Sequence, residues 1–144
     1  MNAAARIHGT CVARDGAGVL LLGPSGAGKS DLALRLLSRG FVLVADDRVD
    51  VFDGFARAPD ALAGLLEVRG LGIVRLPFTS ETRLHVVVEL TCRTERLPLP
   101  ERHAELDLPM TRLNAFEVSA PDRVALALDC ALGLVRQHTG AFAA

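Results

Sequence analysis

The segment at residues 23–30, GPSGAGKS, constrains the fold of this 144-residue chain more than any other. It satisfies the pattern G-x-x-x-x-G-K-[ST], and it lies between an apolar run at residues 19–22 and a helical pattern. The glycines let successive backbone N–H groups turn inward around phosphate oxygens, and the helix N-terminus adds partial positive charge. The alternative is an ordinary glycine-rich turn, but such a turn would not need an apolar strand before it and a helix after it. The segment therefore predicts a phosphate-binding loop made of Gly23, Pro24, Ser25, Gly26, Ala27, Gly28, Lys29 and Ser30.

The lysine of this loop is unusual for the chain. Of the 16 basic residues, 15 are arginines and one is Lys29. A lysine ammonium is a compact point charge that an arginine does not replace at a phosphate site. We expect Lys29 to reach the β- and γ-phosphates of ATP and the hydroxyl of Ser30 to bind Mg²⁺.

Composition excludes several classes of protein. A length of 144 residues with 50% hydrophobic residues predicts one domain, residues 1–144. A net charge of -1 and 4% aromatic residues argue against nucleic-acid binding. No apolar run of membrane-spanning length and no signal-peptide pattern occur, so we expect a cytoplasmic protein without membrane contact. The widely spaced Cys11, Cys92 and Cys130 suggest buried small residues, not a disulfide framework or zinc site.

The region before the loop predicts a β-hairpin. Residues 6–13 have the pattern of a strand, and Asp15-Gly16 is a turn signal before the apolar run at 19–22. With the turn centred near Gly16, paired residue numbers sum to roughly 32, give or take two. This register places Gly23 opposite Gly9 and brings His8 beside the mouth of the loop.

The region after the loop predicts a helix over residues 29–39 and then a strand over 41–45. The strand is continuously apolar, as in a buried parallel strand, and ends at Asp46-Asp47. Further along, we expect the following elements: a strand from 48 up to Gly54, a loop at 56–60, a short helix at 61–66, a strand at 84–90, a mostly irregular segment at 97–110, and a helix at 121–137 with Ser119 as its N-cap.

Asp46 and Asp47 follow a strand at the edge where open α/β sheets bind ligands. Two carboxylates there could hold magnesium, and one could accept the proton of an attacking hydroxyl. The alternative is an acid pair that bonds Arg48 or caps a backbone N–H. His8 could tune a carboxylate or orient the acceptor, although most strand histidines are structural.

Glu67 and Arg69 lie in the segment EVRGLG at residues 67–72, whose two glycines imply a tight backbone path. Glu67 could add a magnesium ligand. Arg69 could stabilise charge developing on a transferred group. A surface ion pair is an equally good interpretation of these two residues.

Four of these segments in order resemble the catalytic domain of the HPr kinase/phosphorylase family. They are IHGTCV, GPSGAGKS, LVADDRVDV and LLEVRGLGIV, and the resemblance is close from about residue 6 to 76. It implies a bacterial enzyme that phosphorylates a serine of the phosphocarrier HPr and also removes that phosphate. It also implies a P-loop kinase fold like that of phosphoenolpyruvate carboxykinase, with a mixed central sheet, flanking helices and homo-oligomers.

The resemblance assigns roles by position. His8, Lys29, Asp46, Asp47 and Arg69 correspond to catalytic residues, one acid being the proton acceptor. Ser30, Glu67 and Asp47 correspond to magnesium ligands, and ATP and Mg²⁺ to the cofactors.

The chain departs from the family pattern at both ends. A separate N-terminal domain and a C-terminal Gly-Arg-Asn are absent, as in short forms of the family. Arg112 and Arg123 could replace the family's C-terminal basic segment, and Arg102 could correspond to its further catalytic arginine. The sequence thus predicts an α/β serine kinase of HPr or a paralogue. A small-metabolite kinase and a nucleotide-binding regulatory module without turnover are the alternatives.

Overall fold

The computed structural model describes residues 5–143, and the chain forms eleven strands, two α-helices and one 3₁₀ helix within that part. The elements in chain order are β1 (Ala5–His8), β2 (Thr10–Arg14), β3 (Ala17–Leu22), α1 (Lys29–Leu37), β4 (Val42–Ala45), β5 (Arg48–Phe52), β6 (Phe55–Arg57), η1 (Asp60–Leu62), β7 (Leu65–Val68), β8 (Gly72–Arg75), β9 (Thr82–Leu90), β10 (Glu101–His103), β11 (Leu108–Leu113) and α2 (Ala120–Ala131).

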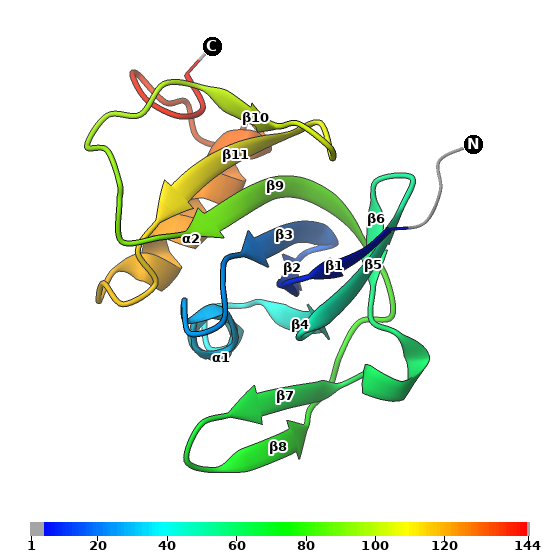
Figure 1. The fold of residues 1–144 in the computed structure, drawn as a ribbon. Helices are drawn as coiled ribbons and strands as arrows, with labels where there is room; N and C mark the ends of the chain where they lie inside the picture. The colour runs from blue at the N-terminus through cyan, green and yellow to red at the C-terminus, as the bar shows by residue number, and fades with distance from the viewer. Residues whose placement is uncertain (1–4, 144) are drawn as a thin grey trace.

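Nine strands form one mixed sheet with the order β1-β5-β6-β9-β3-β2-β4, and β11 pairs with β9 and with β10. The pairs β3–β9 and β9–β11 are parallel, so these three strands point the same way (Figure 1). Because β2 is antiparallel to both β3 and β4, β4 also points in this direction. The carboxyl ends of β3, β4, β9 and β11 therefore share one edge of the sheet, where α/β proteins place their ligands.

Each face of the sheet has its own hydrophobic core. On β3, Val19 and Leu21 pack with α1 and α2, whereas Leu20 belongs to the core on the opposite face. The second core includes Val49 and Val51 of β5, so the strands β5 and β6 fold over the face that the helices leave open. This alternation along β3 follows from the period of two in a strand. The mixed α/β fold predicted from the sequence is confirmed.

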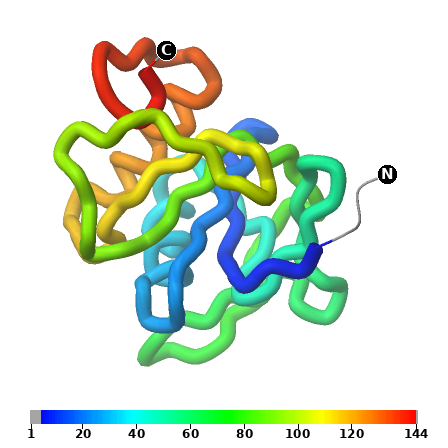
Figure 2. Tube along the Cα trace, turned by 45° about the horizontal axis from the view of Figure 1, so that its top comes forward, coloured from blue at the N-terminus to red at the C-terminus, as the bar shows by residue number. Residues whose placement is uncertain are grey.

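Two smaller parts lie outside this arrangement. The hairpin β7–β8 is a separate two-stranded sheet at the bottom of Figure 1. The segment after α2 lies beside the segment that carries β10, as Figure 2 shows in red and yellow-green. Neither helix in the described part of the chain is long and apolar enough to cross a membrane.

Several predicted elements are confirmed. The hairpin β2–β3 has Thr10 opposite Leu21, within the predicted register, and Asp15 and Gly16 both have positive φ, as a type I′ turn requires. The helix predicted at 29–39 ends at Leu37, and the strands predicted at 41–45 and 84–90 are β4 and β9.

The prediction for the first strand was wrong in its pairing. The segment 6–13 is two strands that separate at Gly9, and only β2 pairs with β3. Strand β1 instead pairs with β5, with His8 opposite Arg48. A Cβ at position 9 would lie 2.9 Å from the backbone oxygen of Leu21, so glycine fits without strain at the point where β1 and β2 separate.

Other corrections concern partners and ends. β4 was expected to be a parallel strand, but its neighbour β2 is antiparallel. Residues 56 and 57 of the predicted loop 56–60 belong to the strand β6. This strand pairs with β5 through a second hairpin turn at Asp53-Gly54, where both residues have positive φ. The short helix predicted at 61–66 is reduced to η1 at Asp60–Leu62, and β7 begins at Leu65.

Two segments near the C-terminus also differ from the prediction. The segment 97–110, expected to be mostly irregular, contains β10 and the start of β11. The last helix starts close to its expected position but ends at Ala131 instead of residue 137. Gly133 has a φ of 76°, a conformation that terminates helices. Ser119 is the N-cap, without a side-chain capping bond.

Two leucines of α1 provide a test of the packing. Leu36 is fully buried in the core between the helices and the sheet, whereas Leu34 is 37% exposed. We expect Leu36→Ala to lower the free energy of unfolding by about 2–5 kcal/mol. The matched Leu34→Ala variant should change it by less than about 1 kcal/mol. Urea denaturation measures both, and equal effects would contradict this packing.

Candidate active site

The loop at residues 23–30 connects β3 to α1 at the carboxyl edge of the sheet. Gly26 and Gly28 have φ values of 85° and 93°, which side chains disfavour. Gly28 is the N-cap of α1, and no side chain caps the helix. The first amide groups of α1 are therefore free of a side-chain acceptor, as a phosphate-binding helix start requires.

The side chain of Lys29 is folded back over this loop. Its Nζ donates to the backbone oxygens of Gly23 at 2.6 Å and of Pro24 at 3.1 Å, and the residue is only 8% exposed. Burial lowers the pKa of Lys29, while the negative charges of Asp46 and Asp47 act in the opposite direction. A buried ammonium held by neutral carbonyls is well placed to exchange them for a phosphate oxygen.

Asp46 lies at the end of β4 and is the most connected polar group of the site. Its Oδ1 accepts hydrogen bonds from the hydroxyls of Ser30 at 2.7 Å and Thr10 at 2.9 Å. Its Oδ2 accepts the backbone N–H of Glu67 at 3.3 Å. One buried carboxylate thus joins the helix of the phosphate loop to β2, β4 and β7.

Asp47 differs from the buried Asp46 in backbone conformation and in exposure. Its φ is 71°, a left-handed conformation that aspartate tolerates better than most residues. This conformation turns the side chain outward, where it is 62% exposed and its Oδ1 lies 3.2 Å from Nε2 of His8. The backbone oxygen of Asp47 accepts the N–H of Gly9, which fixes the point where β1 leaves β2.

The structure brings His8 to the acid pair, but not by the predicted route. The hairpin register was expected to place His8 beside the mouth of the phosphate loop, with Gly9 opposite Gly23. Instead, β1 pairs with β5 and carries His8 to Asp47. The approach of a histidine to the acid pair was anticipated, and the strand pairing that produces it was not.

Glu67 and Arg69 lie on the hairpin β7–β8. The backbone of Glu67 contacts Asp46, while its side chain is exposed. Arg69 lies in the turn and makes no hydrogen bond or ion pair with any other described residue. No group of three or more His, Cys, Asp or Glu side chains within residues 5–143 could hold a metal alone. A magnesium ion here would need Ser30 and ligands from the nucleotide as well.

Thr10 belongs to the site, although the sequence patterns did not predict it. It is fully buried, although it is polar, and its hydroxyl bonds Asp46. One sequence feature could have indicated this role: Thr10 is a polar residue directly after Gly9, at the start of the mostly apolar strand β2.

Two of the arginines considered as counterparts of the family's C-terminal basic residues have partners outside the candidate site. Arg112 bonds Glu89 and Glu101, and Arg102 bonds Asp107. These ion pairs join β9, β10 and β11 rather than reaching the acid pair.

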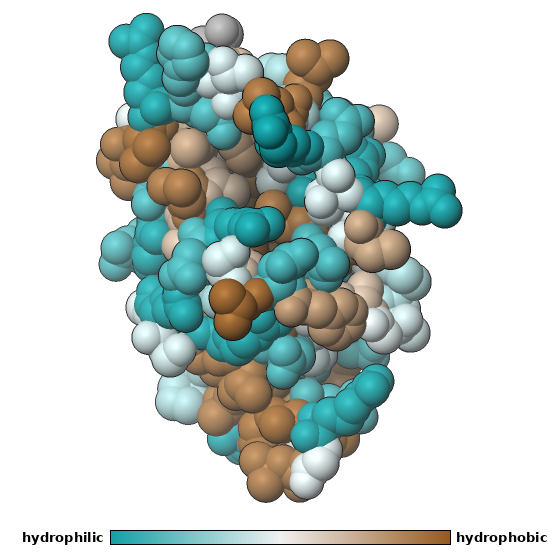
Figure 3. Space-filling view, turned by 90° about the vertical axis from the view of Figure 1, so that its left-hand side faces the viewer, coloured by the Kyte–Doolittle hydropathy of each residue, from teal (hydrophilic) through white to brown (hydrophobic). Residues whose placement is uncertain are grey.

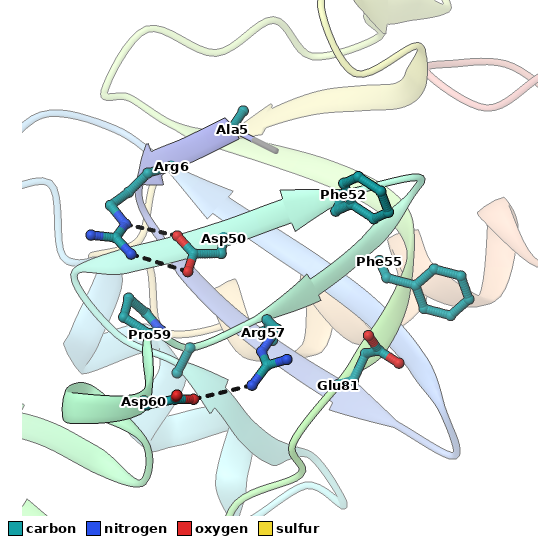
Figure 4. Close-up of a pocket in the computed structure, with 10 residues that line it drawn as sticks. Ala5, Arg6, Asp50, Phe52, Phe55, Arg57, Pro59, Asp60 and Glu81 are labelled. Atoms are coloured by element: carbon teal, nitrogen blue, oxygen red, sulfur yellow. Dashed lines mark hydrogen bonds and ion pairs between the residues drawn. The ribbon is translucent and has the colours of Figure 1, made fainter. Parts of the chain in front are cut away.

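A separate hollow of about 630 Å³ lies over β5 and β6, and Figure 4 shows its lining. Its two arginines already pair with carboxylates, Arg6 with Asp50 and Arg57 with Asp60. It contains no residue of the phosphate loop. We therefore take the edge around the phosphate loop as the candidate active site.

The family of the chain follows from its similarity to known proteins. The family described as "HPr Serine kinase C-terminal domain" matches residues 1–121. The chain belongs to this family. It is 38% identical over 147 residues to the HPr kinase/phosphorylase of Burkholderia lata and 39% identical over 145 residues to that of Cupriavidus metallidurans.

These alignments cover 89% and 88% of this chain, but 45% and 44% of the two relatives, so the chain spans about half of their length. Among solved structures, the chain is similar to one described as the Hpr(Ser) kinase/phosphatase from Coxiella burnetii. The TM-score is 0.73 at 24% identity, covering 90% of this chain and 98% of the other. This likeness shows that the two proteins share the fold.

The two aspartates should differ in their effect on stability. Asp46→Asn weakens the acceptor of three hydrogen bonds in a buried position, and we expect a loss of about 1–3 kcal/mol in the free energy of unfolding. Asp47→Asn keeps the tolerance for positive φ and removes an exposed ion pair, so the loss should stay below about 1 kcal/mol. Chemical denaturation of both variants measures the difference, and the reverse order would contradict the site.

Proposed function

We propose that the chain transfers the γ-phosphoryl group of magnesium-bound ATP to a serine of HPr or a paralogous phosphocarrier. The observation that carries this proposal is the contact between Ser30 of the phosphate loop and Asp46 of the acid pair. It joins a triphosphate-binding element to carboxylates with a histidine alongside. The family to which the chain belongs supports the acceptor.

Ser30 and Asp46 are the residues best placed to hold magnesium. Their hydroxyl and carboxylate oxygens are the donors that this ion prefers, and the two side chains already touch. Glu67 is a further candidate because its backbone reaches Asp46. Asp47 was expected among the ligands, but its Oδ1 lies 3.2 Å from Nε2 of His8 and 3.7 Å from Nη1 of Arg48, so we propose another role for it. Magnesium, when bound with the nucleotide, neutralises charge on the β- and γ-phosphates.

The loop and Lys29 would hold the phosphates. The amide groups at the start of α1 and the glycine backbone would surround them, and Lys29 would exchange the oxygens of Gly23 and Pro24 for phosphate oxygens. Because Ser30 of this loop contacts Asp46, the γ-phosphate would then be held near the acid pair. Positioning and charge stabilisation supply most of the rate enhancement in phosphoryl transfer.

Asp47 is our candidate for the base. The serine hydroxyl of the acceptor gives its proton to a carboxylate oxygen of Asp47, its oxygen bonds to the γ-phosphorus, and the bond to ADP breaks. His8 holds Asp47 in position at 3.2 Å. Arg69, exposed in the β7–β8 turn, would approach the transferred group when the acceptor is bound.

The exposure of these groups favours a protein acceptor over a small metabolite. Asp47 is 62% exposed and His8 43% exposed, whereas a metabolite kinase would enclose its substrate. Figure 3 shows exposed apolar side chains at the lower end of the molecule, where the β7–β8 hairpin lies. The exposed apolar side chains of this part include Leu71 and Ile73. Such a surface beside the acid pair suits contact with a protein.

Three further statements stay predictions: removal of the phosphate in the reverse direction, formation of homo-oligomers, and cytoplasmic localisation. The release of orthophosphate from phosphorylated HPr tests the first. Sedimentation tests the second, and fractionation of cells tests the third.

Incubation with γ-labelled ATP, magnesium and HPr tests the proposed reaction. We expect label on a serine of HPr and no label without magnesium. ATP binding without transfer to any phosphocarrier would favour a regulatory module instead. Transfer to a metabolite in a phosphorylation screen, with none to HPr, would favour a metabolite kinase.

Separate replacements of the acid pair test the division of roles. Asp47→Asn should reduce transfer about 100-fold or more while Mg-ATP affinity changes little, because it removes the base. Asp46→Asn should weaken Mg-ATP binding, because it removes the partner of Ser30. Titration calorimetry and the labelling assay measure the two effects. If both variants transfer phosphate at the normal rate, the proposed mechanism is wrong.

A further inference from the structure

A pocket of about 530 Å³ lies on the side of the phosphate loop that faces away from the acid pair. The loop itself forms one wall, and the ends of β9 and β11 form the others. Its lining includes Pro24, Ala27, Leu90, Asn114 and Phe116. The proposed reaction uses the loop residues of this pocket, but it gives no role to Leu90, Asn114 or Phe116.

The order of the strands explains its position. The phosphate loop follows β3, the acid pair follows β4 on one side, and β9 and β11 lie on the other side. The reacting γ-phosphate belongs beside Asp46 and Ser30, at the side of β4. A triphosphate held across the loop therefore directs its other end toward β9 and β11.

Phe116 presents an aromatic surface at this place. The residue is 70% exposed, and two atoms of its ring lie 3.5 Å from the position that a Cβ at Gly28 would take. Exposed aromatic rings at a pocket mouth provide stacking surfaces for nucleobases. The ring of Phe116 is therefore an exposed apolar surface that lies against Gly28 of the phosphate loop.

The loop that carries Phe116 is fixed rather than loose. Oδ1 of Asn114 accepts the backbone N–H of Phe116 at 3.0 Å. The guanidinium of Arg35 on α1 donates to the backbone oxygens of Ala115 and Glu117. The helix that begins at the phosphate loop thus also bonds the backbone on both sides of Phe116.

Asn114 offers a polar group for recognition. Its Oδ1 is used by Phe116, which leaves its side-chain NH₂ without a hydrogen-bond partner among the described residues. An amide NH₂ at the edge of a stacking surface suits a ring nitrogen or carbonyl oxygen of a base. Leu90, Pro24 and Ala27 add apolar surface to the pocket, and Ser25, Glu89 and Thr91 are its other polar residues.

We propose that this pocket binds the nucleoside part of the phosphoryl donor, with the base stacked on Phe116 and an acceptor atom of the base bonded to the Asn114 amide. This inference rests on the proposed function, because it assigns the donor of that same site. It makes the chain selective for a nucleoside triphosphate over an inorganic polyphosphate.

The first test compares two probes, ATP and inorganic tripolyphosphate, by titration calorimetry. Phe116→Ala should weaken ATP binding about tenfold, as the loss of one base–aromatic stack does, and leave tripolyphosphate binding within about twofold. Phe116→Tyr keeps the ring and should retain ATP affinity. Phe52→Ala is the matched control, because Phe52 is 45% exposed and lines the hollow over β5 and β6.

The second test uses the wild-type chain and its cysteines. Cys92 is exposed and lines the pocket, whereas burial raises the pKa of the Cys11 thiol and keeps it unreactive. We expect saturating ATP to slow alkylation of Cys92, and tripolyphosphate to leave the rate unchanged. Cys130, which lines other pockets, serves as the internal reference in mass spectrometry.

The outcomes separate this inference from the proposed function. Unchanged ATP affinity in Phe116→Ala, or unchanged alkylation of Cys92 with saturating ATP, would overturn the nucleoside pocket even if HPr is phosphorylated. A tenfold loss of ATP affinity together with protection of Cys92 would support the pocket even if HPr is not a substrate.

Discussion

The carboxylate of Asp46 accepts hydrogen bonds from three parts of the chain that are distant in sequence: the hydroxyls of Thr10 and Ser30 and the backbone of Glu67. A buried carboxylate is costly unless its oxygens find such donors. The strand β2, the helix of the phosphate loop and the β7–β8 hairpin therefore have to meet at the end of β4. The geometry of the candidate site follows from this one requirement.

The two neighbouring aspartates divide the site into an inner and an outer half. Asp46 faces Ser30, where we propose that magnesium and the phosphates bind, and the left-handed backbone of Asp47 turns its carboxylate outward to His8. Successive residues of an extended strand face opposite sides, so the sequence alone does not tell which aspartate is buried. In the structure Asp46 is buried, and Asp47, with its positive φ, is exposed. In the proposed reaction, the exposed carboxylate of Asp47 is therefore open to a hydroxyl on the surface of a protein acceptor.

Sequence predicted the parts of the site that depend on local patterns. The phosphate loop, its helix and the strand ending at the acid pair follow from glycine spacing and apolar runs, and the β2–β3 turn follows from Asp15-Gly16. The pairing of β1 with β5 could not be predicted, because residues 6–13 have one continuous strand pattern and the break occurs at Gly9, where the backbone packs closely against Leu21. The bond from Thr10 to Asp46 and the position of Phe116 likewise arise from tertiary packing.

The phosphate loop and Asp46 are proposed to act as one unit through Ser30. A double-mutant cycle on Mg-ATP affinity tests this coupling, using Ser30→Ala, Asp46→Asn and the double variant in titration calorimetry. We expect the double variant to lose less affinity than the two single losses together, with a coupling of about 1 kcal/mol or more. Losses that add within about 0.5 kcal/mol would show that the two residues act independently, and no coupled site would then exist.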